Sequence, residues 1–120
     1  MSIGPGVSGH VVFELKKQRE LCESLLESLQ SRDNEVHRLK FRVEQAKAGG
    51  DPNDLKHEQH MLEEARQSEG KLRRLFEDSL ADLKRLVDTD VENSVAVNDI
   101  KRSDEYHKVL NILNEHTASV

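Results

Sequence analysis

A short run of histidines and carboxylates, His57-Glu58-Gln59-His60 followed by Glu64, is the part of the sequence that most resembles a reactive site. A zinc-protease helix carries two histidines four residues apart with a glutamate between them. Here the two histidines are three residues apart, so that geometry is missed. His57, His60 and Glu64 could share one helix face and hold a metal weakly. We favour the interpretation that they form a solvated polar face.

Two further pairs place an aspartate three residues before a histidine: Asp54 with His57, and Asp104 with His107. Di-iron helical bundles use Glu-x-x-His twice and add two inward glutamates from other helices. Aspartate is shorter than glutamate, and nothing marks inward carboxylates on the first predicted helix. The sequence therefore predicts no metal, no cofactor, no catalytic residue and no enzyme. A metal-dependent helical-bundle enzyme is the remote alternative.

The chain has a single cysteine, Cys22, and so has no intramolecular disulfide. Its neighbours include Leu21, Glu23 and Leu25, whereas a reactive thiol needs a cationic, partly open setting. We interpret Cys22 as a small buried hydrophobe. In a parallel dimer it would face its own copy, where an oxidised crosslink between chains could form.

The sequence predicts that these residues lie on helices. The clearest evidence for a helix is an apolar repeat of seven residues between Val11 and Ala46. Nine of the eleven repeat positions are apolar, and the exceptions are Gln18 and Arg32. A repeat of 3.5 residues per turn makes a narrow stripe that another helix must cover. The polar exceptions either reach out of the stripe or set its register. The predicted seam consists of Val11, Leu15, Gln18, Cys22, Leu25, Leu29, Arg32, Val36, Leu39, Val43 and Ala46.

The helix boundaries are best marked at Gly49-Gly50-Asp51-Pro52, because glycine ends helices and proline suits a first helical position. The pattern predicts a flexible leader over 1–9, a heptad helix over 10–48, a break over 49–51 and a second helix over 52–87. A break or kink is expected over 88–93, where Thr89 and Glu92 fit a capping box. A third amphipathic helix follows over 94–116, and residues 117–120 should fray. The alternative is that the second and third helices form one rod.

The fold class is all-α, an elongated coiled coil that forms a helical hairpin or a parallel dimer. Similar lengths of the first two helices favour an antiparallel hairpin. The flanks of the repeat favour a parallel homodimer, because Glu14 would meet Arg19, and Glu35 would meet Lys40, across the seam. Both arrangements can coexist.

Three large apolar side chains, Phe13, Leu26 and Phe41, fall off the stripe. A two-stranded coil would leave Phe13 and Phe41 exposed. Either a third helix covers these residues or they contact another protein.

Composition limits the classes of function that the chain can serve. Charged residues make up 34% of the 120 residues and aromatic residues only 3%, which suits long helices better than a compact enzyme fold. The net charge is −5 and basic residues cluster only as dipeptides, which argues against nucleic-acid binding. No apolar run is long enough for membrane insertion, and no secretory signal begins the chain. These features predict a cytoplasmic protein, with the nucleus as the alternative.

The predicted function is a non-enzymatic coiled-coil module for oligomerisation and protein–protein interaction. It would act as a structural scaffold, tether or adaptor in a cytoskeletal, centrosomal or trafficking assembly. Its expected partners are a second copy of itself and at least one other protein. The alternative is a monomeric three-helix bundle that binds a single partner.

Overall fold

The computed structural model describes residues 4–117, in which α-helices and one π-helical turn are connected without any strand. This confirms the all-α class. The elements are α1 (Gly4–Gly49), α2 (Pro52–Arg85), the π-turn η1 (Leu86–Val91), α3 (Val97–Arg102) and α4 (Asp104–Thr117). The chain divides into two compact units. We call Leu25–Phe76 the hairpin unit, and Met1–Ser24 with Glu77–Val120 the bundle unit.

The turn of the hairpin unit lies at the predicted break, which the structure confirms. Gly50 has a φ of 77°, a left-handed conformation that glycine adopts without steric cost. Its amide donates a hydrogen bond to the carbonyl of Ala46 at 3.2 Å, which closes the end of α1. The side chain of Asp51 then accepts a hydrogen bond from the amide of Asn53 at 2.9 Å and caps α2.

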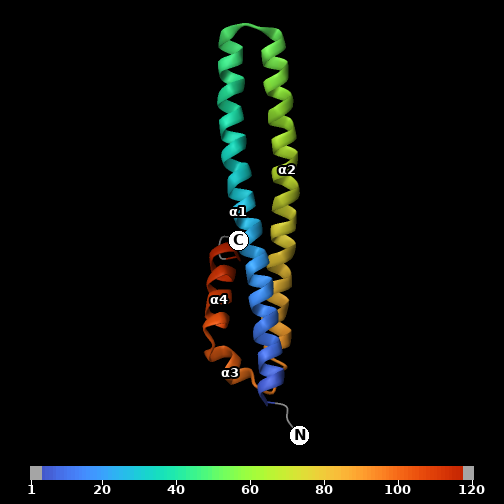
Figure 1. The fold of residues 1–120 in the computed structure, drawn as a ribbon, viewed down its shortest axis with the longest axis vertical. Coiled ribbons are helices and arrows are strands. Elements are labelled where there is room, and N and C mark those ends of the chain that lie inside the picture. Colours follow the sequence, from blue (N-terminus) through green and yellow to red (C-terminus); the bar gives the residue numbers. More distant parts are fainter. Residues whose placement is uncertain (1–3, 118–120) are drawn as a thin grey trace. The chain divides into compact units, whose positions relative to one another are not determined.

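In the hairpin unit, α1 and α2 lie side by side in antiparallel directions (Figure 1). Their facing sides bury Val36, Leu39 and Val43 from α1 and Leu62 and Ala65 from α2, with Leu55 packed against this cluster. The α1 members are three or four residues apart, as one face of a helix requires. The apolar stripe of α1 is therefore covered here by α2 of the same chain.

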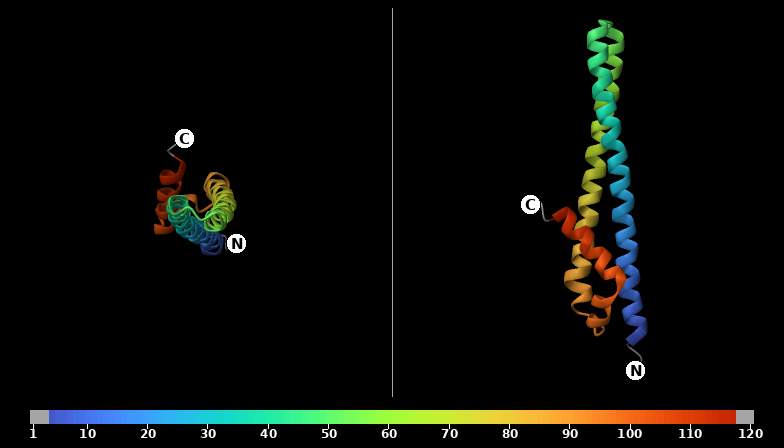
Figure 2. Two further views of the ribbon diagram at one scale, coloured as in Figure 1. Left: turned by 90° about the horizontal axis from the view of Figure 1, so that it is seen from above. Right: turned by 90° about the vertical axis from the view of Figure 1, so that its left-hand side faces the viewer.

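The bundle unit packs the first part of α1 against the end of α2, η1, α3 and α4. Figures 1 and 2 show α4 beside α1. Burial in this unit is dominated by aliphatic residues from every element. Residues with no exposed surface are Leu15, Cys22, Leu83, Val91, Ile100 and Val109. A third layer from α3 and α4 thus completes a core that two helices alone would leave open.

The beginning of the first helix differs from its predicted position. Residues 4–9 belong to α1, whereas the sequence predicted a flexible leader over 1–9; residues 1–3 lie outside the described residues. Pro5 is compatible with this earlier start, because amides in the first helical turn have no acceptor within the helix.

The region after α2 also differs from its predicted boundaries. The helical path continues through η1 to Val91, and the predicted break over 88–93 is displaced to the turns between η1 and α3. Thr89 caps no helix; it lies inside η1, and its carbonyl accepts a hydrogen bond from Asn93 at 2.9 Å. The alternative of one continuous rod is wrong.

The single third helix predicted over 94–116 is two helices, α3 and α4, which meet at Ser103. Ser103 has extended backbone angles. Its Oγ accepts a hydrogen bond from the amide of Tyr106 at 3.2 Å and donates one to the carbonyl of Ile100 at 2.6 Å. One side chain thus ends α3 and caps α4. Of the predicted frayed end, Thr117 closes α4, and residues 118–120 lie outside the described residues.

Gly50 and Gly70, which both lie in the hairpin unit, should respond oppositely to alanine. Gly50→Ala is expected to lower the free energy of unfolding by about 1–2 kcal/mol, because the left-handed conformation strains a Cβ-bearing residue. Gly70→Ala is expected to raise it by up to about 1 kcal/mol, because Gly70 lies inside α2 with no atom within 4 Å of an added Cβ. Urea unfolding followed by far-UV circular dichroism measures both. Equal effects of the two substitutions would contradict this account of the turn.

None of the helices among residues 4–117 combines the length and the apolar character needed to cross a membrane.

Candidate functional site

The predicted seam lies largely inside the chain. Seven of its eleven residues are buried and the remaining four are partly buried; the buried ones are Val11, Leu15, Cys22, Leu29, Val36, Leu39 and Val43. In each unit the residues that cover them come from α2 or from the later elements of the same chain. The stripe therefore does not by itself require a second copy.

Gln18, a polar member of the seam, makes a polar contact within the bundle unit. Its side-chain nitrogen donates hydrogen bonds to the Ser79 carbonyl at 3.2 Å and to the Ser79 Oγ at 3.0 Å. The Ser79 Oγ also lies 3.0 Å from the Sγ of Cys22. These contacts fix the register of α1 against α2, because a shift of either helix would leave buried polar groups without partners.

Arg32, the other polar member, lies in the hairpin unit and leaves the stripe. Its guanidinium pairs with Glu35, one turn further along α1, at 2.7 Å. The Arg32 side chain keeps 37% of its surface exposed. The long side chain therefore reaches solvent from a seam position, which was one of the two interpretations of this residue.

A buried ion pair in the bundle unit joins Arg19 of α1 to Glu105 of α4. Nε of Arg19 lies 2.5 Å from Oε1 of Glu105, and Nη2 lies 3.2 Å from Oε2. The two side chains are only 11% and 9% exposed, so the pair is buried and bidentate. Glu23 binds the same guanidinium at its exposed side. The hydrogen bonds that Arg19 donates to Glu105 raise the pKa of Arg19 above its ordinary value, which keeps the guanidinium charged.

Cys22 is buried and its thiol is held in the protonated form. Burial raises the pKa of Cys22, and the hydrogen bond with Ser79 opposes this only in part. A thiol of raised pKa in an enclosed site has little nucleophilic thiolate at neutral pH.

We expect native Cys22 to react slowly with a chromogenic disulfide reagent and quickly in denaturant.

Burial of Cys22 also makes the stability of the protein depend on pH. Because the pKa of the thiol is raised in the folded state, its contribution to stability is complete below the usual thiol pKa of about 8.5 and is lost as pH rises through the raised pKa. The measurement is urea unfolding between neutral and alkaline pH, with Cys22→Ala as control. Identical slopes for the two proteins would contradict the burial argument.

The apolar residues predicted to lie off the stripe remain partly or wholly accessible. Phe13 is 60% exposed and Phe41 is 63% exposed, whereas Leu26 is partly buried. No element among residues 4–117 covers the two phenylalanines, which leaves contact with another protein as the open alternative for them. Other exposed apolar residues, which the sequence did not single out, are Leu21, Met61, Leu75 and Val95.

The histidine-rich segment lies on the surface of α2. His57 and His60 are exposed, and Nε2 of His60 lies 3.0 Å from Oε1 of Glu64. Asp104 and His107 on α4 are likewise exposed. Among residues 4–117, no three His, Cys, Asp or Glu side chains gather in an arrangement that could hold a metal ion.

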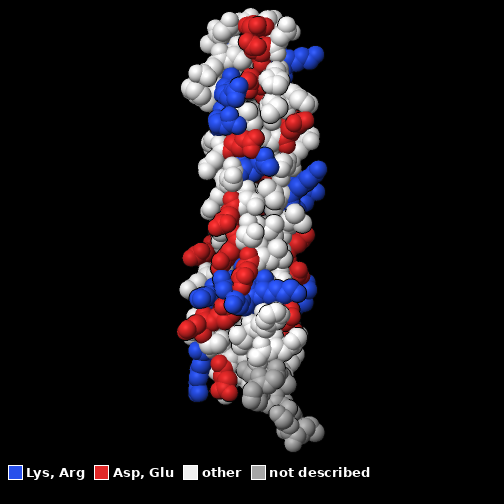
Figure 3. Space-filling view, viewed as in Figure 1, with Lys and Arg blue, Asp and Glu red and all other residues white. Residues whose placement is uncertain are grey.

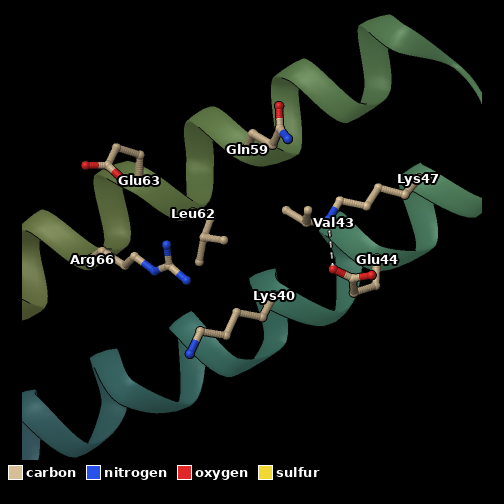
Figure 4. Close-up of a pocket in the computed structure, with 8 residues that line it drawn as sticks. All are labelled: Lys40, Val43, Glu44, Lys47, Gln59, Leu62, Glu63 and Arg66. Atoms are coloured by element: carbon tan, nitrogen blue, oxygen red, sulfur yellow. Dashed lines mark hydrogen bonds and ion pairs between the residues drawn. The ribbon is translucent and has the colours of Figure 1, made fainter.

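A groove of about 630 Å³ runs between α1 and α2 of the hairpin unit (Figure 4). Its α1 side is formed by Lys40, Val43, Glu44 and Lys47. Its α2 side is formed by Gln59, Leu62, Glu63 and Arg66. Val43 and Leu62 provide an apolar floor, and the charged residues form the walls.

Lys40 and Arg66 are the unneutralised charges of this groove. Figure 4 shows Arg66 extending from α2 toward α1, and Lys40 extending to the same end of the groove. At the other end Lys47 pairs with Glu44 at 3.2 Å. Neither Lys40 nor Arg66 forms an ion pair with any residue in the described range 4–117. The groove thus combines two free cations from two helices with an apolar floor.

Elsewhere the surface charge is finely mixed. On the face drawn in Figure 3, acidic and basic side chains alternate along the helices instead of gathering into a large area of one sign. The net negative charge belongs to the bundle unit, with eight Lys or Arg against thirteen Asp or Glu, while the hairpin unit has ten of each. The cations of the groove are therefore a local feature and not part of a generally basic surface.

Sequence reasoning missed the buried polar contacts of the bundle unit. The repeat predicts that Arg19 pairs with Glu14, and Glu35 with Lys40, across a parallel dimer. Within this chain Arg19 pairs with Glu105, and Glu35 pairs with Arg32. The available signal was that Arg19 flanks the seam, where a partly buried charge needs a partner. Nothing in the local pattern pointed to a residue 86 positions away.

Comparison of the chain with models of protein families, with curated proteins and with solved structures found no match.

Proposed function

We propose that the protein is a non-enzymatic interaction module in which a single chain forms its own helical core and presents exposed side chains to a partner protein. The observation that carries this proposal is the contrast between adjacent positions of α1. Leu39 is 1% exposed and Phe41, two residues later, is 63% exposed. The seam is thus used for folding, and the off-stripe phenylalanines are left for contact.

The exposed phenylalanines support the proposal that the protein binds a partner. The chain has three phenylalanines, and two of them, Phe13 and Phe41, keep most of their surface accessible. Complete burial of such a side chain provides roughly 1.5–3 kcal/mol, which folding of this chain leaves largely unused. Aromatic residues are also enriched at the centres of protein interfaces.

A homodimer is the second candidate, and the heptad flanks favour it. The homodimer is less strongly supported than the sequence alone suggested, because α2 and the later elements of the same chain already cover much of the stripe. A role as a scaffold, tether or adaptor in a cytoskeletal, centrosomal or trafficking assembly, in the cytoplasm or nucleus, agrees with either candidate.

Two measurements test the proposal. Sedimentation equilibrium should give a mass near 13.7 kDa over a range of dilutions; a dilution-stable mass of twice that value would favour the homodimer. Affinity capture followed by quantitative mass spectrometry should then recover proteins whose yield falls with Phe41→Ala or Phe13→Ala. Arg38→Ala, at an exposed position of α1, is the control. Equal recovery by all variants would contradict a role for the phenylalanines.

A further inference from the structure

We propose that the groove of the hairpin unit between Lys40 and Arg66 binds an acidic amphipathic helix of a partner protein. This inference rests on the proposed interaction function and specifies the chemistry of the partner. It is carried by the floor, the walls and the charge of the groove.

The floor suits a small number of apolar side chains. Val43 from α1 and Leu62 from α2 meet at the base of the groove. Both side chains are buried in the hairpin unit, with 6% and 9% of their surface exposed, so the floor offers only a small apolar area to a partner. An apolar residue of a partner helix would pack between the charged walls, while its neighbours remain at the rim.

The walls determine the sign of the partner's charge. Lys40 and Arg66 come from different helices and extend to the same end of the groove (Figure 4). Neither has an ion pair among residues 4–117, whereas Lys47, the third cation of the groove, pairs with Glu44, and the neighbouring Arg42 pairs with Glu58 at 2.8 Å. A carboxylate placed between Lys40 and Arg66 would gain two charge-assisted contacts, one of them with the planar guanidinium.

Neither acidic residue of the groove, Glu44 or Glu63, forms an ion pair with Lys40 or Arg66. Glu44 is occupied by Lys47. Glu63 accepts a hydrogen bond from the side-chain nitrogen of Gln67 at 3.3 Å, and Figure 4 shows its carboxylate pointing away from α1. An incoming carboxylate at this end therefore meets the two cations, while the Glu63 carboxylate points away from α1.

The length of the groove accommodates two turns of a helix. Lys40 and Lys47 are two helical turns apart on α1, which corresponds to about 10 Å along the groove. A helix laid between α1 and α2 can offer apolar residues to the floor and carboxylates to the walls at spacings of three and four residues. Each such charge contact is modest, but together they select partners by sign.

The test uses the full chain and fluorescently labelled synthetic helical peptides. One peptide carries glutamates and leucines on one face, and a second replaces each glutamate with lysine. Fluorescence anisotropy should show binding of the acidic peptide, weakened by about tenfold in the double variant Lys40→Glu with Arg66→Glu. The matched control is Arg38→Glu with Lys56→Glu, which makes the same charge change at exposed positions of the same unit outside the groove. Far-UV circular dichroism checks that both variants keep their helices.

The inference is overturned by any of four results: no binding of the acidic peptide, equal binding of the lysine peptide, equal weakening by both double variants, or tighter binding of a labelled short DNA duplex measured in the same way. Its failure is separable from failure of the proposed function. If captured proteins depend on Phe41 but the acidic peptide does not use the groove, only the groove assignment is wrong. If the peptide binds but no protein is captured, the interaction function is wrong.

Discussion

Glu105→Ala is expected to lower the free energy of unfolding by about 3 kcal/mol, at the lower end of the range for breaking a buried ion pair. The substitution leaves the Arg19 guanidinium enclosed between α1 and α4 without its bidentate partner. Glu23 remains on the exposed side of Arg19 and limits the loss. Urea unfolding monitored by far-UV circular dichroism and by Tyr106 fluorescence measures the change.

Glu23→Ala is the matched control for this prediction. Glu23 binds the same guanidinium, but half of its side-chain surface is exposed, so its loss should cost less than about 1 kcal/mol. The double substitution Arg19→Met with Glu105→Leu removes both buried charges and should recover most of the stability lost in Glu105→Ala. If the two glutamate variants are equally stable, the buried pair does not hold α4 in place.

Leu39→Asp is expected to destabilise the protein by about 4 kcal/mol or more. The substitution removes a side chain that is 1% exposed and places a carboxylate among Val36, Val43 and Leu62. The loss combines the burial of leucine, about 2–5 kcal/mol, with the cost of an unpaired buried polar group. Thermal and urea unfolding curves should both shift, with loss of helical signal at lower denaturant concentration.

Phe41→Asp, two residues along the same helix, provides the comparison. Because Phe41 is 63% exposed and faces away from the core, its replacement should change stability by about 0.5 kcal/mol or less. A large loss of stability from Phe41→Asp would mean that this phenylalanine packs against part of the chain, and the proposed contact surface would be wrong. The two variants together test the assignment of faces on α1.

The local pattern of the sequence was sufficient for the parts of the fold that depend on neighbouring residues. The period of the apolar residues from Val11 to Ala46 predicted which face of α1 is covered, and Gly49-Gly50-Asp51-Pro52 predicted the turn. These features arise from the geometry of one helix and its ends, which a few consecutive residues determine.

The sequence could not show which elements cover the apolar stripe of α1. A stripe requires a partner but does not distinguish α2 of the same chain from a helix of a second chain, because both present similar apolar side chains. The contact between Arg19 and Glu105 and that between Gln18 and Ser79 join residues 86 and 61 positions apart. They depend on how the chain returns after η1, and no local spacing encodes that path.

The boundary between α3 and α4 was missed for a different reason. Ile100, Tyr106, Val109 and Leu113 continue an apolar face across Ser103, so periodicity alone joins the two helices. A serine can interrupt such a pattern by hydrogen bonding to the backbone, as Ser103 does with Ile100 and Tyr106. The competing local hydrogen bonds, and not the apolar pattern, determine where the chain bends.

The facing apolar residues of the hairpin unit have a consequence for how the length of this protein can change in related sequences. Val36 and Leu39 of α1 pack with Leu62 and Ala65 of α2, and the chain between them passes through the turn at Gly50. An insertion in only one of the two helices within this stretch would shift one set of apolar residues along the other and rotate it out of the shared core. Length variants that keep the fold should therefore gain or lose whole helical turns in matched pairs, one on each side of the turn.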